Sequence, residues 1–191
     1  GWTIEAAEAV CVGEGVGPTD ALDLLTHLVE KSLVVADARV RPPRYHMLET
    51  IRQYAREKLA DANDDESVGE RHLAYFLRFA ETAEPCYFHP DQLQWYAVTD
   101  AELDNIRAAL EWSLARARAE SGLRLASALD RYWVARLHWR EASGWLERLL
   151  ELPARDPQSA VRAKALWILG HIYYYYGSTA ALRATEESLR M

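Results

Sequence analysis

The sequence has few cysteines, no long apolar run and no sign of a chemical scaffold. Its two cysteines, Cys11 and Cys86, form no CxxC pair, which argues against a zinc site or a disulfide framework and is typical of the reducing cytoplasm. No run of about 18 apolar residues occurs, so we expect no membrane span. Half of the 191 residues are hydrophobic and 27% are charged, which predicts a folded chain.

Basic residues are in the minority. The chain has 22 Lys and Arg against 29 Asp and Glu, which gives a net charge of −7. A net negative chain has no general attraction for phosphate backbones or anionic lipid. We therefore expect no membrane partner. No methionine stands at Gly1, and a helical pattern is still running at Met191, so we expect a piece of a longer protein.

Proline and glycine divide the chain unevenly. Between Pro90 and Pro153 there is no proline and little glycine, which predicts a long helical stretch. The acidic segment 61–66 is the expected seam between an N-terminal unit and the rest. The expected parts are a winged-helix-like unit at 1–62, a linker helix region at 63–98, and truncated helical repeats at 99–191.

The first 60 residues alternate between helical and strand patterns. Thr3 is expected to cap a first helix, and Thr19 or Asp20 a second one with apolar residues at i, i+3 and i+4. Strands are expected at 32–36 and 44–48, followed by a third helix. The order helix, helix, hairpin, helix is that of a small winged-helix unit.

The remainder is expected to be helical. Capping boxes at 67–70 (SVGE) and 99–102 (TDAE) predict two helix starts. Two helix pairs follow, with turns at His138-Trp139 and Gly177-Ser178. These turns are about 40 residues apart, near the 34-residue repeat of tetratricopeptide pairs. The predicted fold class is mainly α: a winged-helix unit with a β-hairpin, then a tetratricopeptide-like α-α array.

No motif predicts an active site. The glycine segment 13–18 lacks the lysine of a P-loop, so we interpret it as a connecting loop. His138 and Glu141 are expected to make a turn contact, and the six histidines form no HExxH or HxxxH motif. We therefore expect no catalytic residue, metal or cofactor within this segment.

The winged-helix pattern raises the question of DNA binding. Arg39, Arg41 and Arg44 would decorate the wing, where phosphate contacts are usual. The helix that would enter the groove, Thr19 to Leu33, has three acids against one lysine and no Arg, Asn or Gln for base edges. We therefore expect DNA contact only through other domains of the parent protein.

Two strings carry a resemblance to a known family. The sequence reads YHMLETIRQYA at 45–55 and ELDNIRAAL at 102–110. Together they resemble the middle of bacterial signal-transduction ATPases of the STAND class (NB-ARC/AfsR-like), as found in LuxR-type and AfsR-type transcriptional regulators. Those proteins join a P-loop NTPase domain, a winged helix and a helical-repeat sensor. The string LWILGHIY at 166–173 resembles a tetratricopeptide repeat.

The resemblance implies a signalling role without catalysis by this segment. It implies ATP and Mg²⁺ in the parent's NTPase domain, and a protein or small-molecule effector bound by the repeats and relayed to that domain. Related ATPases place Met-His-Asp before the third helix, where this chain has Met47-Leu48-Glu49. Leu48 in place of His argues against nucleotide sensing here, and His46 is expected to be a partly exposed strand residue and not a nucleotide ligand. The alternative is a plain repeat scaffold for protein–protein assembly.

The aromatic residues suggest where an effector would bind. Four consecutive tyrosines end one helix, and a helix cannot bury all four. If Leu169, Gly170 and Tyr173 pack inward, as the repeat resemblance implies, the opposite side predicts a cationic, aromatic groove for an acidic peptide or an anionic aromatic effector. The other interpretation is packing between repeats, with the rings that remain exposed meant for a next repeat after Met191. The predicted groove residues are Arg124, Ser127, Arg131, Val134, Lys164, Trp167, His171, Tyr174 and Tyr175.

Overall fold

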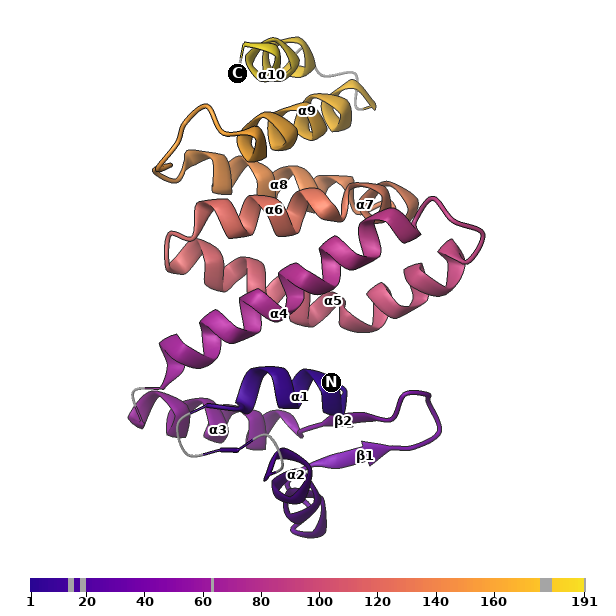
Figure 1. Cartoon of the computed structure of the whole chain (residues 1–191), viewed down its shortest axis with the longest axis vertical. Helices are drawn as coiled ribbons and strands as arrows, with labels where there is room; N and C mark the ends of the chain where they lie inside the picture. Colours follow the sequence, from indigo (N-terminus) through magenta and orange to yellow (C-terminus); the bar gives the residue numbers. More distant parts are fainter. Residues whose placement is uncertain (14–15, 18–19, 63, 176–179, 191) are drawn as a thin grey trace. The chain divides into compact units, whose positions relative to one another are not determined.

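The chain is mainly helical, with one small two-stranded antiparallel sheet (Figure 1). The computed structural model describes residues 1–13, 16–17, 20–62, 64–175 and 180–190. It divides into two compact units, Gly1–Tyr75 and Phe76–Met191. This division falls inside the region 63–98 that the sequence suggested as a linker, and we describe each unit by itself.

The first unit begins with two helices and a hairpin. Its elements are α1 (Ile4–Cys11), α2 (Asp20–Glu30), β1 (Val35–Asp37), β2 (Arg44–His46) and α3 (Glu49–Asp61). Thr3 Oγ1 accepts a hydrogen bond from the Ala6 amide at 3.3 Å, which confirms the predicted cap. β1 pairs antiparallel with β2, with Ala36 opposite Tyr45. Thr19, one of the two predicted caps of α2, lies outside the described residues.

The first strand begins later than expected, at Val35, because the residues before it hydrogen-bond to the end of α2. Ser32 has a φ of 57°, in the left-handed region. The amides of Leu33 and Val34 then both donate to the Leu28 carbonyl, at 3.0 and 3.2 Å. These residues therefore close the C-terminus of the helix instead of pairing with the second strand.

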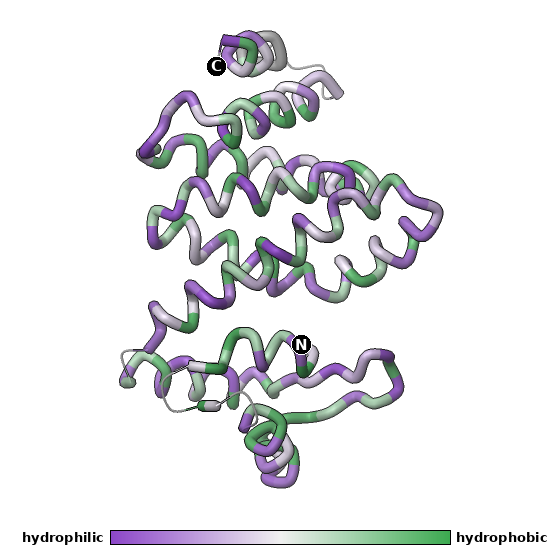
Figure 2. Tube along the Cα trace, viewed as in Figure 1, coloured by the Kyte–Doolittle hydropathy of each residue, from purple (hydrophilic) through white to green (hydrophobic). Residues whose placement is uncertain are grey.

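The second unit is a succession of packed helices. Helix α4 (Asp65–Cys86) enters from the first unit and is followed by α5 (Gln92–Ala115), α6 (Ala119–Ala128), α7 (Asp130–Ala135), α8 (Trp139–Glu151), α9 (Ala160–Tyr175) and α10 (Ala180–Leu189). Helix α6 packs against α5, α8 and α9, and α10 packs against α9. Hydrophobic and hydrophilic residues alternate along these helices, as expected where one side of each is buried (Figure 2).

Both predicted capping boxes are wrong, because α4 starts at Asp65 and α5 at Gln92. The amide of Gln92 donates to the His89 carbonyl at 3.0 Å, so the turn after α4 runs directly into α5. Thr99 lies inside the helix and is fully buried. Its hydroxyl donates to the Trp95 carbonyl at 2.8 Å and lies 2.7 Å from the hydroxyl of Tyr87. Thr99 therefore anchors the α4–α5 hairpin instead of capping a helix.

The first member of the first predicted helix pair, which precedes the turn at His138-Trp139, is not one helix but divides at Leu129 into α6 and α7. The buried Trp133 indole donates to the Ala126 carbonyl at 3.0 Å. In a continuous helix this carbonyl would accept from the amide of Asp130. The turn expected at His138 is confirmed, with Leu137 at a φ of 59°. The turn at Gly177-Ser178 lies outside the described residues.

Candidate functional site

The predicted groove residues of α6 and α9 lie beside α4, on what we call the α4/α6/α9 face. Arg124 of α6 forms an ion pair with Glu81 of α4, with Nη2 and Oε1 2.6 Å apart. Lys164 of α9 forms a second ion pair with Glu84 of α4, also at 2.6 Å. The structure therefore brings these two bases together, and the acids of α4 compensate their charge.

Ser127 lies beneath these ion pairs. Its side chain is buried, and its hydroxyl has no hydrogen-bond partner among the described residues. It lines a small cavity of about 60 Å³ together with Glu81, Glu84, Arg124 and Lys164. Ser127 is therefore buried below the α4/α6/α9 face, and the charged side chains of Arg124, Lys164, Glu81 and Glu84 form its surface.

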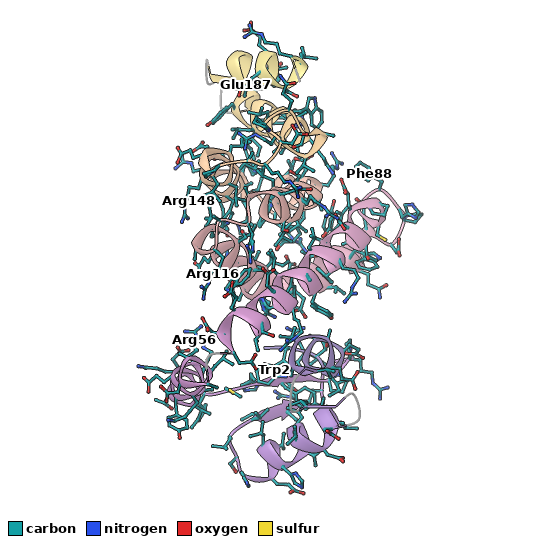
Figure 3. The ribbon with its side chains drawn as sticks, turned by 60° about the vertical axis from the view of Figure 1, so that its left-hand side comes forward. Trp2, Arg56, Phe88, Arg116, Arg148 and Glu187 are labelled. Atoms are coloured by element: carbon teal, nitrogen blue, oxygen red, sulfur yellow. The ribbon has the colours of Figure 1, made fainter. Side chains whose placement is uncertain are left out.

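Arg131 lies on the surface beyond the two ion pairs. Its guanidinium carbon is 5.1 Å from the ring centroid of Phe88, which is a cation–π arrangement. Phe88 projects outward at the edge of the unit (Figure 3). Val134, one turn further along, is half-buried. Within the described part of the chain, Glu81 and Glu84 pair with Arg124 and Lys164 and not with Arg131.

Aromatic side chains continue along α9 as a connected series, which we call the aromatic row: Trp167, His171, Tyr174 and Tyr175. Trp167 stacks on His171 at a centroid distance of 5.4 Å, and His171 meets the edge of Tyr175 at 5.0 Å. The exposed fractions are 52% for Trp167, 75% for Tyr174 and 55% for Tyr175. As expected, the helix does not bury all of the consecutive tyrosines, since Tyr174 and Tyr175 are exposed, while Tyr176 lies outside the described residues.

Tyr173, the first of the consecutive tyrosines, is hydrogen-bonded to a neighbouring helix. The hydroxyl of Tyr173 donates to the Glu147 carboxylate of α8. Partial burial and this carboxylate raise the pKa of Tyr173 to about 12. Tyr173 therefore serves helix packing, as expected, and the exposed tyrosines are the two that follow it.

Asp130, at the start of α7, is a polar residue that sequence reasoning missed. Burial raises the pKa of its carboxyl, against the opposing effect of His171, Arg131 and Lys164. Its Oδ1 and the Nδ1 of His171 are both shielded from solvent and have no hydrogen-bond partner among the described residues. A single acid among apolar residues gives no sequence signal for such a position.

The predicted wing arginines are partly engaged by their own chain. The guanidinium of Arg39 donates two hydrogen bonds to the Asp37 carboxylate, at 2.9 and 3.0 Å, and the Arg39 amide donates a third at 3.0 Å; these hydrogen bonds lower the pKa of Asp37 to about 2. Arg44 donates to the Gly1 carbonyl at 2.7 Å. Arg41 is exposed, and so is His46, as expected for that strand residue.

The expected contact between His138 and Glu141 is present, with Nδ1 and Oε2 3.7 Å apart. Glu141 is held mainly by Arg107 of α5, which donates to both carboxylate oxygens at 2.6 and 2.7 Å. This arrangement joins α5 to α8 and is structural. Within the described ranges, no three His, Cys, Asp or Glu side chains are grouped as metal ligands, and no helix is long and apolar enough to cross a membrane.

No family model matches the chain, and no solved structure matches it. The chain is similar to curated proteins of Mycobacterium bovis and of two strains of Mycobacterium tuberculosis, each named "Putative HTH-type transcriptional regulator". Each is 38% identical over 169 residues, which is 87% of this chain and 19% of the relative. The chain thus spans about a fifth of the length of these relatives.

Proposed function

We propose that this chain is a non-catalytic arm and sensor segment of a longer, ATP-dependent bacterial transcriptional regulator. Its first unit would be the winged-helix-like arm, and its second unit a tetratricopeptide-like array that binds a protein or small-molecule effector. ATP and Mg²⁺ would bind in the parent's NTPase domain, DNA would be contacted through other domains, and the protein would act in the cytoplasm. The names of the relatives and the small share of their length that the chain spans support this proposal.

The aromatic row is the observation that carries the proposal. Trp167, Tyr174 and Tyr175 are each more than half exposed and lie on one helix. Large rigid rings supply contact area at little cost in conformational entropy, which suits recognition of a peptide or an aromatic molecule. The ring of Trp139, at the start of α8, lies 6.0 Å from that of Tyr175 and extends the row.

The charged residues of the α4/α6/α9 face indicate where an anionic group of the effector could bind. Arg124 and Lys164 are already paired with carboxylates, so an anionic group gains less from them than an unpaired base would give. Arg131 lies over Phe88, at the same face. We therefore place the anionic group of the effector at Arg131 and its aromatic or apolar part on the row.

A plain repeat scaffold for protein–protein assembly remains the second candidate. A sensor and a scaffold differ in whether binding of a partner changes nucleotide release in the longer protein. In the longer protein we would follow release of a fluorescent ATP analogue, with and without cleared extract of the producing cells. A sensor is expected to change its release rate on addition of extract. Partner binding without any change in release favours the scaffold.

The site is tested with a double variant, Arg131→Ala with Trp167→Ala. The proposal expects this variant to lose the response to extract at an unchanged melting temperature. Tyr54→Ala is the matched control, because it removes an exposed ring from α3, outside the face. A full response in the double variant, or equal loss in the control, would exclude the α4/α6/α9 face as the effector site.

A further inference from the structure

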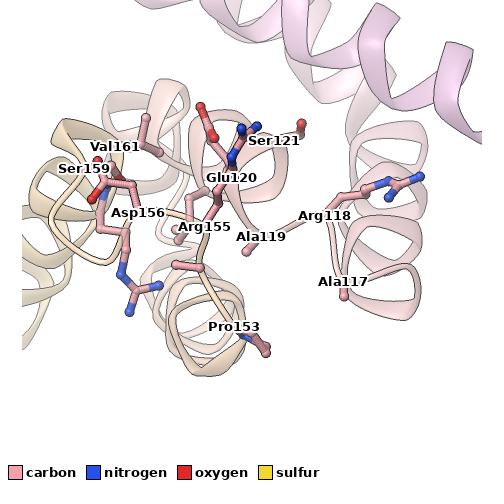
Figure 4. A pocket seen from close by; sticks show the side chains of 13 residues that line it. Ala117, Arg118, Ala119, Glu120, Ser121, Pro153, Arg155, Asp156, Ser159 and Val161 are labelled. Atoms are coloured by element: carbon pink, nitrogen blue, oxygen red, sulfur yellow. Dashed lines mark hydrogen bonds between the residues drawn. The ribbon is translucent and has the colours of Figure 1, made fainter.

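A separate cavity of about 580 Å³ lies between the α5–α6 turn and the α8–α9 loop (Figure 4). Residues 117–121 form one side of it and residues 153–162 the other. It shares only Val161 with the small cavity of the α4/α6/α9 face. Its volume is in the range typical of small-molecule sites.

The charged residues of this cavity carry one net positive charge: Arg118, Arg155 and Arg162 against Glu120 and Asp156. Asp156 accepts a hydrogen bond from the Gln158 amide at 3.0 Å, which holds it in the loop. Arg155 is exposed and forms no ion pair with a carboxylate among the described residues. A singly charged anion therefore fits this lining better than a doubly charged one.

Arg162, in the first turn of α9, is the cation with unfilled donors. Its Nη2 donates to the Leu150 carbonyl at 2.9 Å, near the C-terminus of α8. Its Nε and Nη1 are shielded from solvent and have no acceptor within the described part of the chain. A buried charged donor without an acceptor is destabilising. Arg162 lines the cavity, so a small reorientation of its guanidinium would bring these donors to an oxygen ligand there, which would supply the acceptor.

Two helices begin at this cavity. Helix α6 starts at Ala119 and α9 at Ala160, so the first-turn amides of both are near the lining. Helix N-termini favour negative charge. Leu123, Val161 and Pro153 give the same cavity an apolar wall. The lining therefore combines donors for one anionic group with surface for a small hydrocarbon body.

We propose that this cavity binds a monocarboxylic acid with a small apolar or aromatic body. The carboxylate accepts hydrogen bonds from Arg162 in the first turn of α9 and from Arg155 in the α8–α9 loop, and the body lies against Leu123 and Val161. Guanidinium groups pair strongly with carboxylates. This site is independent of the α4/α6/α9 face, so either proposal can fail alone.

Titration calorimetry with the 191-residue chain tests the ligand class. The probes are benzoate, the neutral analogue benzamide, acetate and inorganic phosphate, each up to about 10 mM. The proposal expects benzoate to bind more tightly than acetate, because of its apolar body, and benzamide to bind not at all. Equal binding of benzoate and benzamide, tighter binding of phosphate, or no binding of benzoate overturns it.

Variants locate the site. Arg162→Gln is expected to weaken benzoate binding roughly tenfold or more, which corresponds to the loss of a hydrogen bond to a charged group. Arg155→Gln is expected to weaken it a few-fold and, because Arg155 is exposed, keeps the test valid if Arg162→Gln does not fold. Arg78→Gln is the matched control, since it removes an exposed arginine outside the cavity. Equal effects in all three variants would show screening of net charge and overturn the proposal.

Discussion

The two units of this chain bury very different amounts of apolar side chain. The described core of the first unit consists of small groups and a few aliphatic residues, such as Leu25 and Val34, and helix α3 has no buried residue. The second unit fully buries Tyr132, Trp133 and a series of leucines from successive helices. Because apolar burial is the main stabilising term in folding, most of the stability is expected in the second unit.

The difference in core also affects which unit can support a binding surface. Packed helices can hold side chains in fixed positions, and rigid support is what a binding site needs. The aromatic row lies on α9, whose other side is buried through Leu166, Ile168 and Ile172. The arginines predicted for a wing, Arg39, Arg41 and Arg44, lie on a short hairpin of the first unit instead. The second unit is therefore the better place for a specific ligand site.

The largest expected effect comes from removing a ring of the second core. Trp133→Ala deletes a fully buried indole and its hydrogen bond to Ala126. We expect a loss of about 3–5 kcal/mol in the free energy of unfolding of the second unit. Chemical denaturation followed by circular dichroism measures it. A loss below about 1 kcal/mol would show that this core is not the stable part of the chain.

A pair of glycines tests how closely the helices pack. A Cβ at Gly122 would lie 2.5 Å from Leu149 and 2.6 Å from the hydroxyl of Ser113, whereas a Cβ at Gly144 meets nothing within 4 Å. Gly122→Ala is expected to destabilise by about 1–3 kcal/mol. Gly144→Ala, in the middle of α8, is expected to stabilise by up to about 1 kcal/mol. Thermal melts of both variants check this, and equal shifts would contradict the close packing of α5, α6 and α8.

Two ion pairs extend the comparison to electrostatics. Arg107 donates to Glu141 in the second unit, and this hydrogen bonding lowers the pKa of Glu141 below its ordinary 4.5. The pair therefore stabilises the fold at pH above 4.5, and that stabilisation is lost as the pH falls through the lowered pKa. Arg107→Met is expected to cost about 0.5–1.5 kcal/mol at pH 7 and less at pH 3.

The corresponding pair of the first unit gives the control for this pH series. Arg39 and Asp37 are joined by similar hydrogen bonds on an exposed turn. Arg39→Gln is expected to raise the pKa of Asp37 toward its ordinary value, and because the pair lies on an exposed turn, where solvent screens it, the accompanying fall in melting temperature is expected to be small. Unfolding curves at pH 3 and 7, with the carboxyl titration followed by NMR, measure both. The comparison fails if Arg39→Gln destabilises as much as Arg107→Met.

The last prediction is that the chain does not bind DNA. The chain is expected to shift no duplex DNA in a gel assay at low salt, because the wing arginines are largely engaged and the net charge is negative. A salt-dependent shift that disappears when Arg39, Arg41 and Arg44 are changed together to Glu would reverse this expectation.

Regular helical periodicity made much of the fold predictable. The order of helices and the hairpin, the cap at Thr3 and the exposure of Tyr174 followed from local spacing. The early starts of α4 and α5 and the break at Leu129 did not, because contacts distant in sequence decide them. The indole of Trp133, for example, takes the Ala126 carbonyl only once the helices have packed.

The candidate site was predictable only in part, for the same reason. Spacing placed Arg124 and Lys164 on one side of their helices, but their partners Glu81 and Glu84 come from α4, far away in sequence. Nor could spacing show that Ser127 is buried or that Asp130 lies near His171. Pairing between distant helices therefore changed the expected cationic groove into a charge-compensated face beside an aromatic row.

The most direct test of the effector face is amide hydrogen exchange in the longer protein, measured with and without the extract that changes nucleotide release. The account predicts that the extract slows exchange in α9, between Lys164 and Tyr175, and that the double variant Arg131→Ala with Trp167→Ala shows no such protection. Protection confined to other segments, with α9 unchanged while nucleotide release still responds, would contradict it.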